Sequence, residues 1–408
     1  MKTWNCICAI VSYALLFFTL ITCDDGKNNN EIQTNNYIIT FDPDNGSDNT
    51  TIIVLENNKV SKPENPRKYL SGLFEGTLNN IPEYIFNGWY NDNIIWNFDT
   101  IITENITLKA KWITPVFTPI ILTGTDDFLT QAVTYVNDNI CTDGYTLFLD
   151  NDISSSNTQK IEKDVKLTII GINSERKIIY TNNEGKYYSR FFEISGSIEI
   201  GENITIICHD NYYLIDYAID LLYTFSSTTT PCKITLKNGS KVTRINNYGN
   251  LIIEGGEITE VQLRAGTFFM TGGRFVEDSY LYEGIEYPLE TILLISAPLK
   301  QYNPSTYISG NAEIGNIYLD NRQTDPKINI ASNNINVKGN ISLGWGNDIN
   351  TWKNKTIFIA SDGYIFSNND ITKFSLGNYY IENQLKSLSE SYMLEIDIIN
   401  NEIKLVSK

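Results

Sequence analysis

Lys233-Ile-Thr-Leu-Lys-Asn-Gly-Ser240 opens the stretch of sequence that decides the fold of this 408-residue chain. The same scheme returns in Asn250-Leu-Ile-Ile-Glu-Gly-Gly-Glu-Ile-Thr259 and in Thr267-Phe-Phe-Met-Thr-Gly-Gly-Arg-Phe275, where a short alternating strand is followed by a glycine turn and a second strand. Alignment places one set of apolar residues at intervals of 17: Leu236, Ile253 and Met270. Each is followed five or six positions on by another apolar residue: Val242, Ile258 and Phe275. Strand, glycine turn and strand at a short period predict a β-solenoid.

Weaker copies of the pattern extend the solenoid in both directions. They are residues 197–206 upstream, and Ile308, Ile328–Ile330 and Ile341–Leu343 downstream. A single coil cannot bury its own apolar face, so stacking at the strand spacing of about 4.8 Å builds one continuous core. We therefore expect the aligned residues at intervals of 17 to form a buried ladder.

Both ends of the solenoid carry capping patterns. Residues 125–138 give the strongest helix signal, with Thr125 as the expected N-cap and Asp126 and Asp127 at the positive helix start. Residues 393–406 predict a closing β-hairpin that turns at Asn400-Asn401. Caps are expected because an open first or last coil exposes unpaired strand edges.

The helix and the strand that follows it, Asp143-Gly-Tyr-Thr-Leu-Phe-Leu149, resemble the N-terminal cap of bacterial right-handed β-helix proteins of the pectate-lyase-like superfamily. Further stretches are similar to coils of surface lipoproteins of that type: residues 249–258, 266–274, 315–320 and 327–331. The resemblance implies a right-handed parallel β-helix over residues 113–408, beginning with a linker at 113–122. The chain is thus expected to be mostly β.

Residues 37–112 form a separate compact unit. Its motifs, in chain order, are Thr40-Phe-Asp42, Val60-Ser-Lys-Pro63, Phe86-Asn-Gly-Trp-Tyr90, Trp96-Asn-Phe-Asp99 and Ile106-Thr-Leu-Lys-Ala-Lys-Trp112. This order resembles the Listeria–Bacteroides repeat, also called the internalin-type B-repeat. The resemblance implies a small β-grasp-like module of surface proteins. Residues 70–82 look like an insertion into a link that is short in the family.

The tryptophans Trp89, Trp96 and Trp112 of this unit admit two interpretations. They could form a carbohydrate-stacking platform, or they could pack in the core of the module. Core packing is favoured, because these aromatic residues stand at positions that the family uses structurally.

The first residues predict export and a lipid anchor. Lys2 precedes an apolar stretch at residues 7–21 that is too short for a relaxed membrane span, and a polar segment follows. Leu20-Ile-Thr-Cys23 resembles the lipobox of bacterial lipoproteins, with Thr22 departing from the usual small residue. This resemblance implies a signal peptide at residues 1–22 and lipidation of Cys23. Residues 23–36 are too polar to order themselves and read as a flexible tether.

Composition restricts the partners. The net charge of −17 argues against nucleic acid, which requires clustered Lys and Arg. Beyond Cys23 and the two cysteines of the signal, only Cys141, Cys208 and Cys232 remain, too few for a disulfide framework. Cys208 and Cys232 are separated by about one coil length, so a single disulfide between stacked neighbours is feasible.

No catalytic, cofactor or metal site is predicted. His209, the only histidine, follows Cys208 directly, and adjacent strand residues point to opposite faces, so the two cannot share a site. Three aspartate pairs could act as acid and base or bind calcium, but turns in an acidic chain produce such pairs anyway: Asp150 with Asp152, Asp216 with Asp220, and Asp320 with Asp325.

The sequence therefore favours a non-enzymatic, lipid-anchored protein of the cell envelope that presents a rigid solenoid for adhesion or ligand binding. Its expected partners are the membrane, through the lipid, and a host or envelope protein or glycan. The outer surface is favoured over the periplasm. One alternative is a purely structural protein of the envelope. The other is a polysaccharide lyase or glycoside hydrolase on a β-helix scaffold. A concave groove lined by three or more acidic residues and a basic one would favour that alternative.

Overall fold

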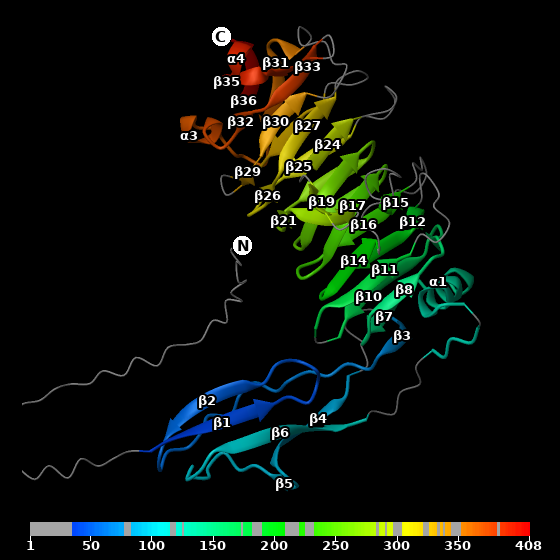
Figure 1. Cartoon of the computed structure of the whole chain (residues 1–408), viewed down its shortest axis with the longest axis vertical. Coiled ribbons are helices and arrows are strands. Elements are labelled where there is room, and N and C mark those ends of the chain that lie inside the picture. The colour runs from blue at the N-terminus through cyan, green and yellow to red at the C-terminus, as the bar shows by residue number, and fades with distance from the viewer. Residues whose placement is uncertain are drawn as a thin grey trace, which may run out of the picture.

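The computed structural model describes residues 35–408 except 77–82, 115–119, 125, 173, 182–189, 209–219, 225–231, 283–284, 290–291, 297–303, 321–325, 333–334, 338, 344–351 and 382–383. The signal peptide, Cys23 and most of the tether lie outside this range, as do Thr125, His209, Asp216 and Asp325. In the part of the chain that is described, no helix is long and apolar enough to span a membrane. Figure 1 shows a small N-terminal sheet and a long stack of strands that follows it.

The N-terminal module is a five-stranded sheet in the order β2-β1-β6-β4-β5. Its strands are β1 (Asn36–Asp42), β2 (Thr50–Leu55), β4 (Ile85–Asn91), β5 (Ile94–Ile95) and β6 (Ile106–Ile113). Strands β1 and β6 pair in parallel and the other pairs are antiparallel. The alternation in β6 buries Leu108 and Ala110 against Ile39 and Phe41 of β1, which forms the core of the module.

The tryptophans of the module pack in or against this core, as predicted. Trp89 is buried and meets the Phe41 ring edge-on at 5.0 Å between ring centroids. Trp96 and Trp112 are partly buried against the same cluster. The Trp112 Nε1 donates a hydrogen bond to the carbonyl oxygen of Pro43 at 3.0 Å, which satisfies its polar atom.

The rest of the chain is a parallel solenoid whose coils contribute to two long sheets (Figure 1). We call the 12-stranded sheet the first facet. Its parallel strands are β7 (Tyr145–Leu149), β10 (Lys166–Gly171), β13 (Ser197–Ile200), β16 (Lys233–Leu236), β18 (Asn250–Ile253), β20 (Thr267–Met270), β25 (Ser305–Ile308), β28 (Ile328–Ile330) and β31 (Lys355–Ala360).

The 15-stranded sheet bends, because the two halves of its longer strands pair with different neighbours. In β17, Val242 pairs with Ile206, whereas Ile245 pairs with Leu222. We call the part before the bend the second facet and the part after it the third facet. The second facet holds β8 (Ile153–Ser155), β11 (Arg176–Tyr180), β14 (Ile204–Cys208), β21 (Arg274–Phe275), β26 (Glu313–Ile314), β29 (Asn336–Val337) and the first halves of β17 (Lys241–Asn247) and β19 (Glu257–Leu263).

The third facet continues from the second halves of β17 and β19. It also holds β9 (Gln159–Ile161), β12 (Arg190–Ile194), β15 (Asp220–Thr224), β24 (Ile292–Ser296), β27 (Asn316–Asp320), β30 (Asn340–Leu343) and β32 (Ser375–Leu376). Two hairpins stand apart from the facets: β22 (Asp278–Tyr282) with β23 (Ile285–Leu289), and β33 (Asn378–Ile381) with β34 (Gln384–Ser387). Two short helices lie near the C-terminus, α3 (Asn368–Ile371) and α4 (Leu388–Ser391).

The predicted apolar ladder is confirmed. Leu236 pairs with Ile253 and Ile253 with Met270, and all three side chains are fully buried. The second set of residues, which pairs across β17, β19 and β21, is also buried: Val242, Ile258 and Phe275. The 17-residue register is therefore correct for these coils, and their apolar face lies inside the solenoid.

The helix α1 (Phe128–Asp138) caps the first coils but begins later than predicted. Asp127, and not Thr125, is the N-cap, and its carboxylate accepts a hydrogen bond from the Thr130 amide at 2.9 Å. An aspartate at this position both satisfies an unpaired amide and complements the helix dipole. Four residues of α1 are buried against the solenoid: Leu129, Ala132, Val133 and Val136.

A second N-terminal cap comes from the insertion in the repeat module. Strand β3 (Gly72–Glu75) leaves the module and pairs antiparallel with β7, the first strand of the first facet. At the other end, the predicted hairpin is confirmed: β35 (Tyr392–Asp397) pairs with β36 (Glu402–Ser407), and β36 pairs antiparallel with β31. Asn401 in the turn has φ of 54°, a conformation that asparagine tolerates well. Both edges of the first facet are thus covered.

The cysteines do not stack as the spacing predicted. Cys208 ends β14 on the second facet and pairs with Tyr180. Cys232 precedes β16 on the first facet, and its carbonyl oxygen accepts a hydrogen bond from the Asn250 amide. The two buried residues thus do not occupy the same position of neighbouring coils, which was the reason for expecting a disulfide between them. Cys141 is a half-buried free thiol.

Candidate functional site

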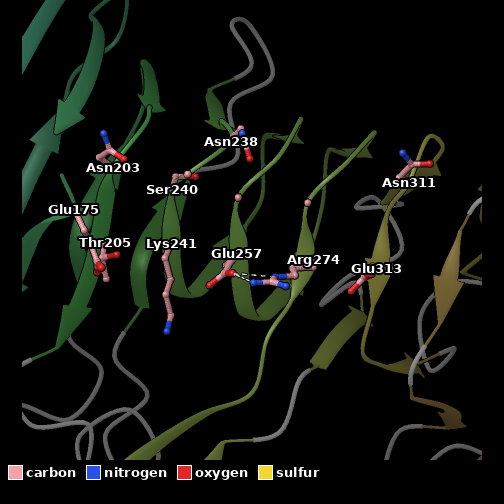
Figure 2. A pocket seen from close by; sticks show the side chains of 13 residues that line it. Glu175, Asn203, Thr205, Asn238, Ser240, Lys241, Glu257, Arg274, Asn311 and Glu313 are labelled. Atoms are coloured by element: carbon pink, nitrogen blue, oxygen red, sulfur yellow. Dashed lines mark hydrogen bonds and ion pairs between the residues drawn. The ribbon is translucent and has the colours of Figure 1, made fainter. Parts of the chain in front are cut away.

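A groove of about 570 Å³ runs along the turns that join the first and second facets (Figure 2). It crosses successive coils, so its lining comes from equivalent positions of β11, β14, β17, β19, β21 and β26. The lining residues are Glu175, Asn203, Thr205, Asn238, Gly239, Ser240, Lys241, Gly256, Glu257, Gly273, Arg274, Asn311 and Glu313. We call this hollow the turn groove.

Main-chain atoms form the floor of the turn groove. The turns adopt a left-handed backbone conformation, and most of them use glycine, which has no side chain, at this position. Gly239, Gly256 and Gly273 have φ of 78°, 83° and 79°, and Asn203 has 58° in the preceding coil. A Cβ atom on Gly256 would lie 2.4 Å from the Ser240 Oγ. A side chain at Gly256 or Gly273 would displace the neighbouring coil, whereas Asn203 adopts the same left-handed conformation with its side chain in place. The missing side chains leave room for a ligand.

A row of charged residues of alternating sign lines the wall of the turn groove. Register pairs Lys241 with Glu257, Glu257 with Arg274, and Arg274 with Glu313. The Arg274 Nε donates to the Glu257 Oε1 at 2.9 Å, and the Arg274 Nη2 contacts the same oxygen (Figure 2). The hydrogen bond to Glu257 raises the pKa of Arg274, so its guanidinium is positively charged at neutral pH. The side chains remain open to solvent, with 57% of Arg274 and 31% of Glu257 exposed.

The turn groove is a concave hollow lined by three acidic residues together with basic ones, a composition that favours an enzyme. Glu175, Glu257 and Glu313 supply three carboxylates, and Lys241 and Arg274 supply two cations. No motif in the sequence marks any of these residues as functional. One sequence signal could have identified them. The residues that directly follow the glycine turns of the repeat align in one column when the coils stack.

A second polar cluster lies on the outer side of the third facet. The Arg244 Nε is 3.6 Å from the Asp220 Oδ1 and 3.4 Å from the Glu260 Oε2. Only 13% of the Arg244 side chain, 11% of Asp220 and 23% of Glu260 are exposed. Burial raises the pKa of Asp220, although Arg244 and a hydrogen bond from Asn246 oppose this shift. Charged groups withdrawn from water on an outer face are unusual and mark a candidate site.

Hydrogen bonds extend this cluster along the solenoid axis. The Gln262 Nε2 donates to Glu260 at 2.6 Å, and the Arg264 Nη2 donates to the Gln262 Oε1 at 2.6 Å. Arg264 also donates to the Ser296 Oγ, which in turn donates to the Asp320 Oδ2 at 3.0 Å. The network thus joins strands β15, β17, β19, β24 and β27, and we call it the third-facet network.

Of the three predicted aspartate pairs, only Asp150 with Asp152 lies wholly within the described residues. Asp150 and Asp152 are exposed at a turn, where the Asp152 Oδ1 accepts a hydrogen bond from the Lys177 amide. Asp220 and Asp320, each from a different predicted pair, instead lie at the two ends of the third-facet network. Among the described residues, no group of three or more His, Cys, Asp or Glu side chains could hold a metal ion.

Comparison with known proteins supports the assignment of the N-terminal module only. Searches against curated proteins and against solved structures gave no match. Residues 37–69 and 80–111 match the family model of the Listeria-Bacteroides repeat domain. The interruption of the match, at residues 70–79, contains β3, the strand that leaves the module for the solenoid. The N-terminal region of this chain therefore carries a Listeria-Bacteroides repeat domain, set in front of a parallel β-solenoid.

Proposed function

We propose that this protein is a non-enzymatic, lipid-anchored protein of the cell envelope that binds a ligand through its solenoid. The observation that carries the proposal is the turn groove, with its backbone floor and its wall of alternating charges. Its five charged residues include three acids and two bases, so the wall has little net charge. Such a wall suits an uncharged or zwitterionic ligand, a glycan or an envelope or host protein segment, better than a polyanion.

The state of the charged residues favours binding over catalysis in the turn groove. Arg274 is exposed, Glu257 is half-buried, and the two side chains are hydrogen-bonded to each other. An acid–base catalyst needs two groups whose pKa values are pushed apart by burial or by like charge. Paired side chains that are open to water serve instead as donors and acceptors for ligand hydroxyl or amide groups.

The groove proposal is tested with the full chain, solubilised in mild detergent, on a panel of immobilised glycans and matrix proteins. The variant Glu257→Ala/Arg274→Ala should lose retention on whichever member binds the native protein. The matched control is Lys59→Ala/Asp99→Ala, which removes an exposed ion pair of the repeat module. Equal retention of the groove variant and the control would refute binding in the turn groove.

The anchor is a separate part of the proposal and rests on the lipobox-like Leu20-Ile-Thr-Cys23. Lipidation of Cys23 would hold the protein at a membrane, with residues 24–36 as a tether. Cys23→Ala should release the protein from membranes or leave the signal uncleaved. Unchanged detergent partitioning and unchanged mass of this variant would exclude the anchor. Protease treatment of intact cells would then distinguish the outer surface, which we favour, from the periplasm.

The third-facet network favours a second candidate function, polysaccharide cleavage. Asp220 and Glu260 contact the same Arg244 nitrogen at 3.6 and 3.4 Å, so their contacting oxygens are at most 7.0 Å apart, the sum of the two distances. Glycosidases hold their two carboxyl groups about 5–10 Å apart. Release of reducing or unsaturated ends from polysaccharides, abolished by Asp220→Asn or Glu260→Gln, would establish this function and refute the non-enzymatic one.

A further inference from the structure

Two aromatic rings are stacked on the outer face of the first facet. Phe269 of β20 and Tyr307 of β25 are register partners on neighbouring coils. Their ring centroids are 5.0 Å apart and their planes are 16° apart, and each residue is 38% exposed. The rings therefore form a flat apolar plate on the surface, unlike the tryptophans of the repeat module, which pack in or against its core.

The plate has a rim of hydroxyl groups. Strand alternation puts the residues two positions before and after each ring on the same outer face. These are Thr267 and Thr271 in the first coil, and Ser305 and Ser309 in the next. Along the register, Ile252 and Asn329 continue the row on either side. None of these six neighbours is charged.

The plate and the turn groove lie on the two sides of one turn. Phe269 precedes the turn at Gly272-Gly273, and Arg274, which lines the groove, follows it directly. A ligand that occupies the groove thus needs to extend only across this turn to reach the rings.

We infer that Phe269 and Tyr307 form a stacking subsite for a sugar ring of a neutral glycan whose chain continues into the turn groove. The inference deepens the proposed binding function and rests on it. A pyranose presents an apolar C–H face to the rings, and its hydroxyl edge matches the Thr and Ser rim. Aromatic side chains supply a large contact area to such a face.

Other occupants fit the plate less well. A stable protein partner needs roughly 1,000 Å² or more of buried interface, and two rings with a hydroxyl rim provide only a small apolar area. Nucleobases also stack on aromatic side chains, but single strands require a row of cations along the backbone. Next to the rim, the register places one cation, Lys327 beside Ser305, and one acid, Glu254 beside Thr271. The chain as a whole carries a net charge of −17, which repels acidic glycans as well.

Native gel electrophoresis of the detergent-solubilised full chain tests the subsite, with a soluble β-glucan, a galactomannan or a xylan in the gel, and polygalacturonate as the acidic comparator. We expect a neutral polysaccharide to retard the native protein and Phe269→Ala/Tyr307→Ala to weaken this binding at least tenfold. Phe269→Leu/Tyr307→Leu should bind as weakly, because it keeps apolar area without a flat ring. Phe128→Ala, which removes an equally exposed ring from α1, should bind normally.

The outcomes separate the subsite from the proposed function. If a neutral polysaccharide retards the native protein and both ring variants alike, the stacking subsite is refuted while binding in the turn groove stands. Retardation by polygalacturonate alone would refute the inference that the ligand is a neutral glycan. If no polysaccharide retards the native protein, the glycan inference fails, and the proposed function is then decided by the groove variant on the protein members of the panel. Thermal unfolding of each ring variant verifies that the solenoid remains folded.

Discussion

Leu73, which lies in the insertion of the repeat domain, is the antiparallel partner of Leu147 in the first strand of the solenoid. Its side chain is fully buried in the solenoid core. The next residue, Phe74, points to the other side and meets the Phe148 ring edge-on at 5.9 Å between centroids. The insertion therefore belongs to the solenoid in structure, although it lies within the repeat domain in sequence. The module is thus joined to the solenoid through β3 as well as through the linker.

Replacing Leu73 by Ala should destabilise the solenoid and loosen the module from it. Loss of a buried leucine side chain costs about 2–5 kcal/mol in free energy of unfolding. The measurement is denaturant unfolding followed by circular dichroism, together with proteolysis of the linker, which should accelerate. The exposed Ile53→Ala in β2 is the control and should change neither. Unchanged stability of Leu73→Ala would mean that β3 does not cap the solenoid.

Ile253→Asp should unfold the central coils, because it buries an unpaired charge between Leu236 and Met270. The expected loss is several kcal/mol in free energy of unfolding. The neighbouring Ile252→Asp is a sharp control, since its side chain lies on the outer, partly exposed face of the same strand. Soluble expression and thermal unfolding of both variants provide the measurement. Equal effects of the two substitutions would contradict the inward orientation of Ile253.

Gly256→Ala should lower the free energy of unfolding by more than the strain of a left-handed alanine alone. A non-glycine residue in this conformation costs about 1–2 kcal/mol. At Gly256 the new Cβ would also lie 2.4 Å from the Ser240 Oγ, which forces the adjacent coil to move. Gly363→Ala isolates the first effect, because φ there is 77° and no atom lies within 4 Å of the added carbon. Denaturation midpoints of the two variants should therefore differ, with Gly256→Ala the less stable.

Acid should destabilise the C-terminal cap through Asp370. Burial favours the neutral form, but hydrogen bonds from Tyr364, from the amide and hydroxyl of Ser367 and from Lys373 outweigh it and lower the pKa of Asp370 to about 2. Because the folded-state pKa lies below the ordinary value of 3.8, this stabilisation is complete above about pH 4 and is lost as the pH falls towards 2. The lowered pKa of Asp370 thus contributes about 2 kcal/mol to the free energy of unfolding.

The measurement for Asp370 is the free energy of unfolding between pH 2 and 5. Asp370→Asn should be less stable than the native chain at pH 5, and the difference should shrink as the pH approaches 2. Asp126→Asn, which changes an exposed aspartate beside α1, should follow the native pH profile. A constant difference between Asp370→Asn and the native chain across this range would contradict the assignment.

The parallel solenoid, its 17-residue register, the closing hairpin and the core role of the tryptophans were readable in the sequence. The first two follow from a short apolar period and from glycines at fixed positions. The repeat domain was recognisable because its motifs, such as Phe86-Asn-Gly-Trp-Tyr90, are specific in type and order. Lipidation of Cys23 remains a prediction from sequence, whereas the different positions of Cys208 and Cys232 remove the reason for expecting a disulfide between them.

Only the tertiary structure decided which distant residues meet. The sequence of β3 marks it as an insertion, yet nothing local indicates that its partner is β7. Likewise, Asp220 and Arg244 come together because β15 and β17 pair on the third facet, with Leu222 opposite Ile245. Strand periods and turn chemistry act over a few residues and can be read from the chain. Which strands pair and which charged residues meet depends on the number of residues that each coil places between two facets. That number is set by packing against the neighbouring coils.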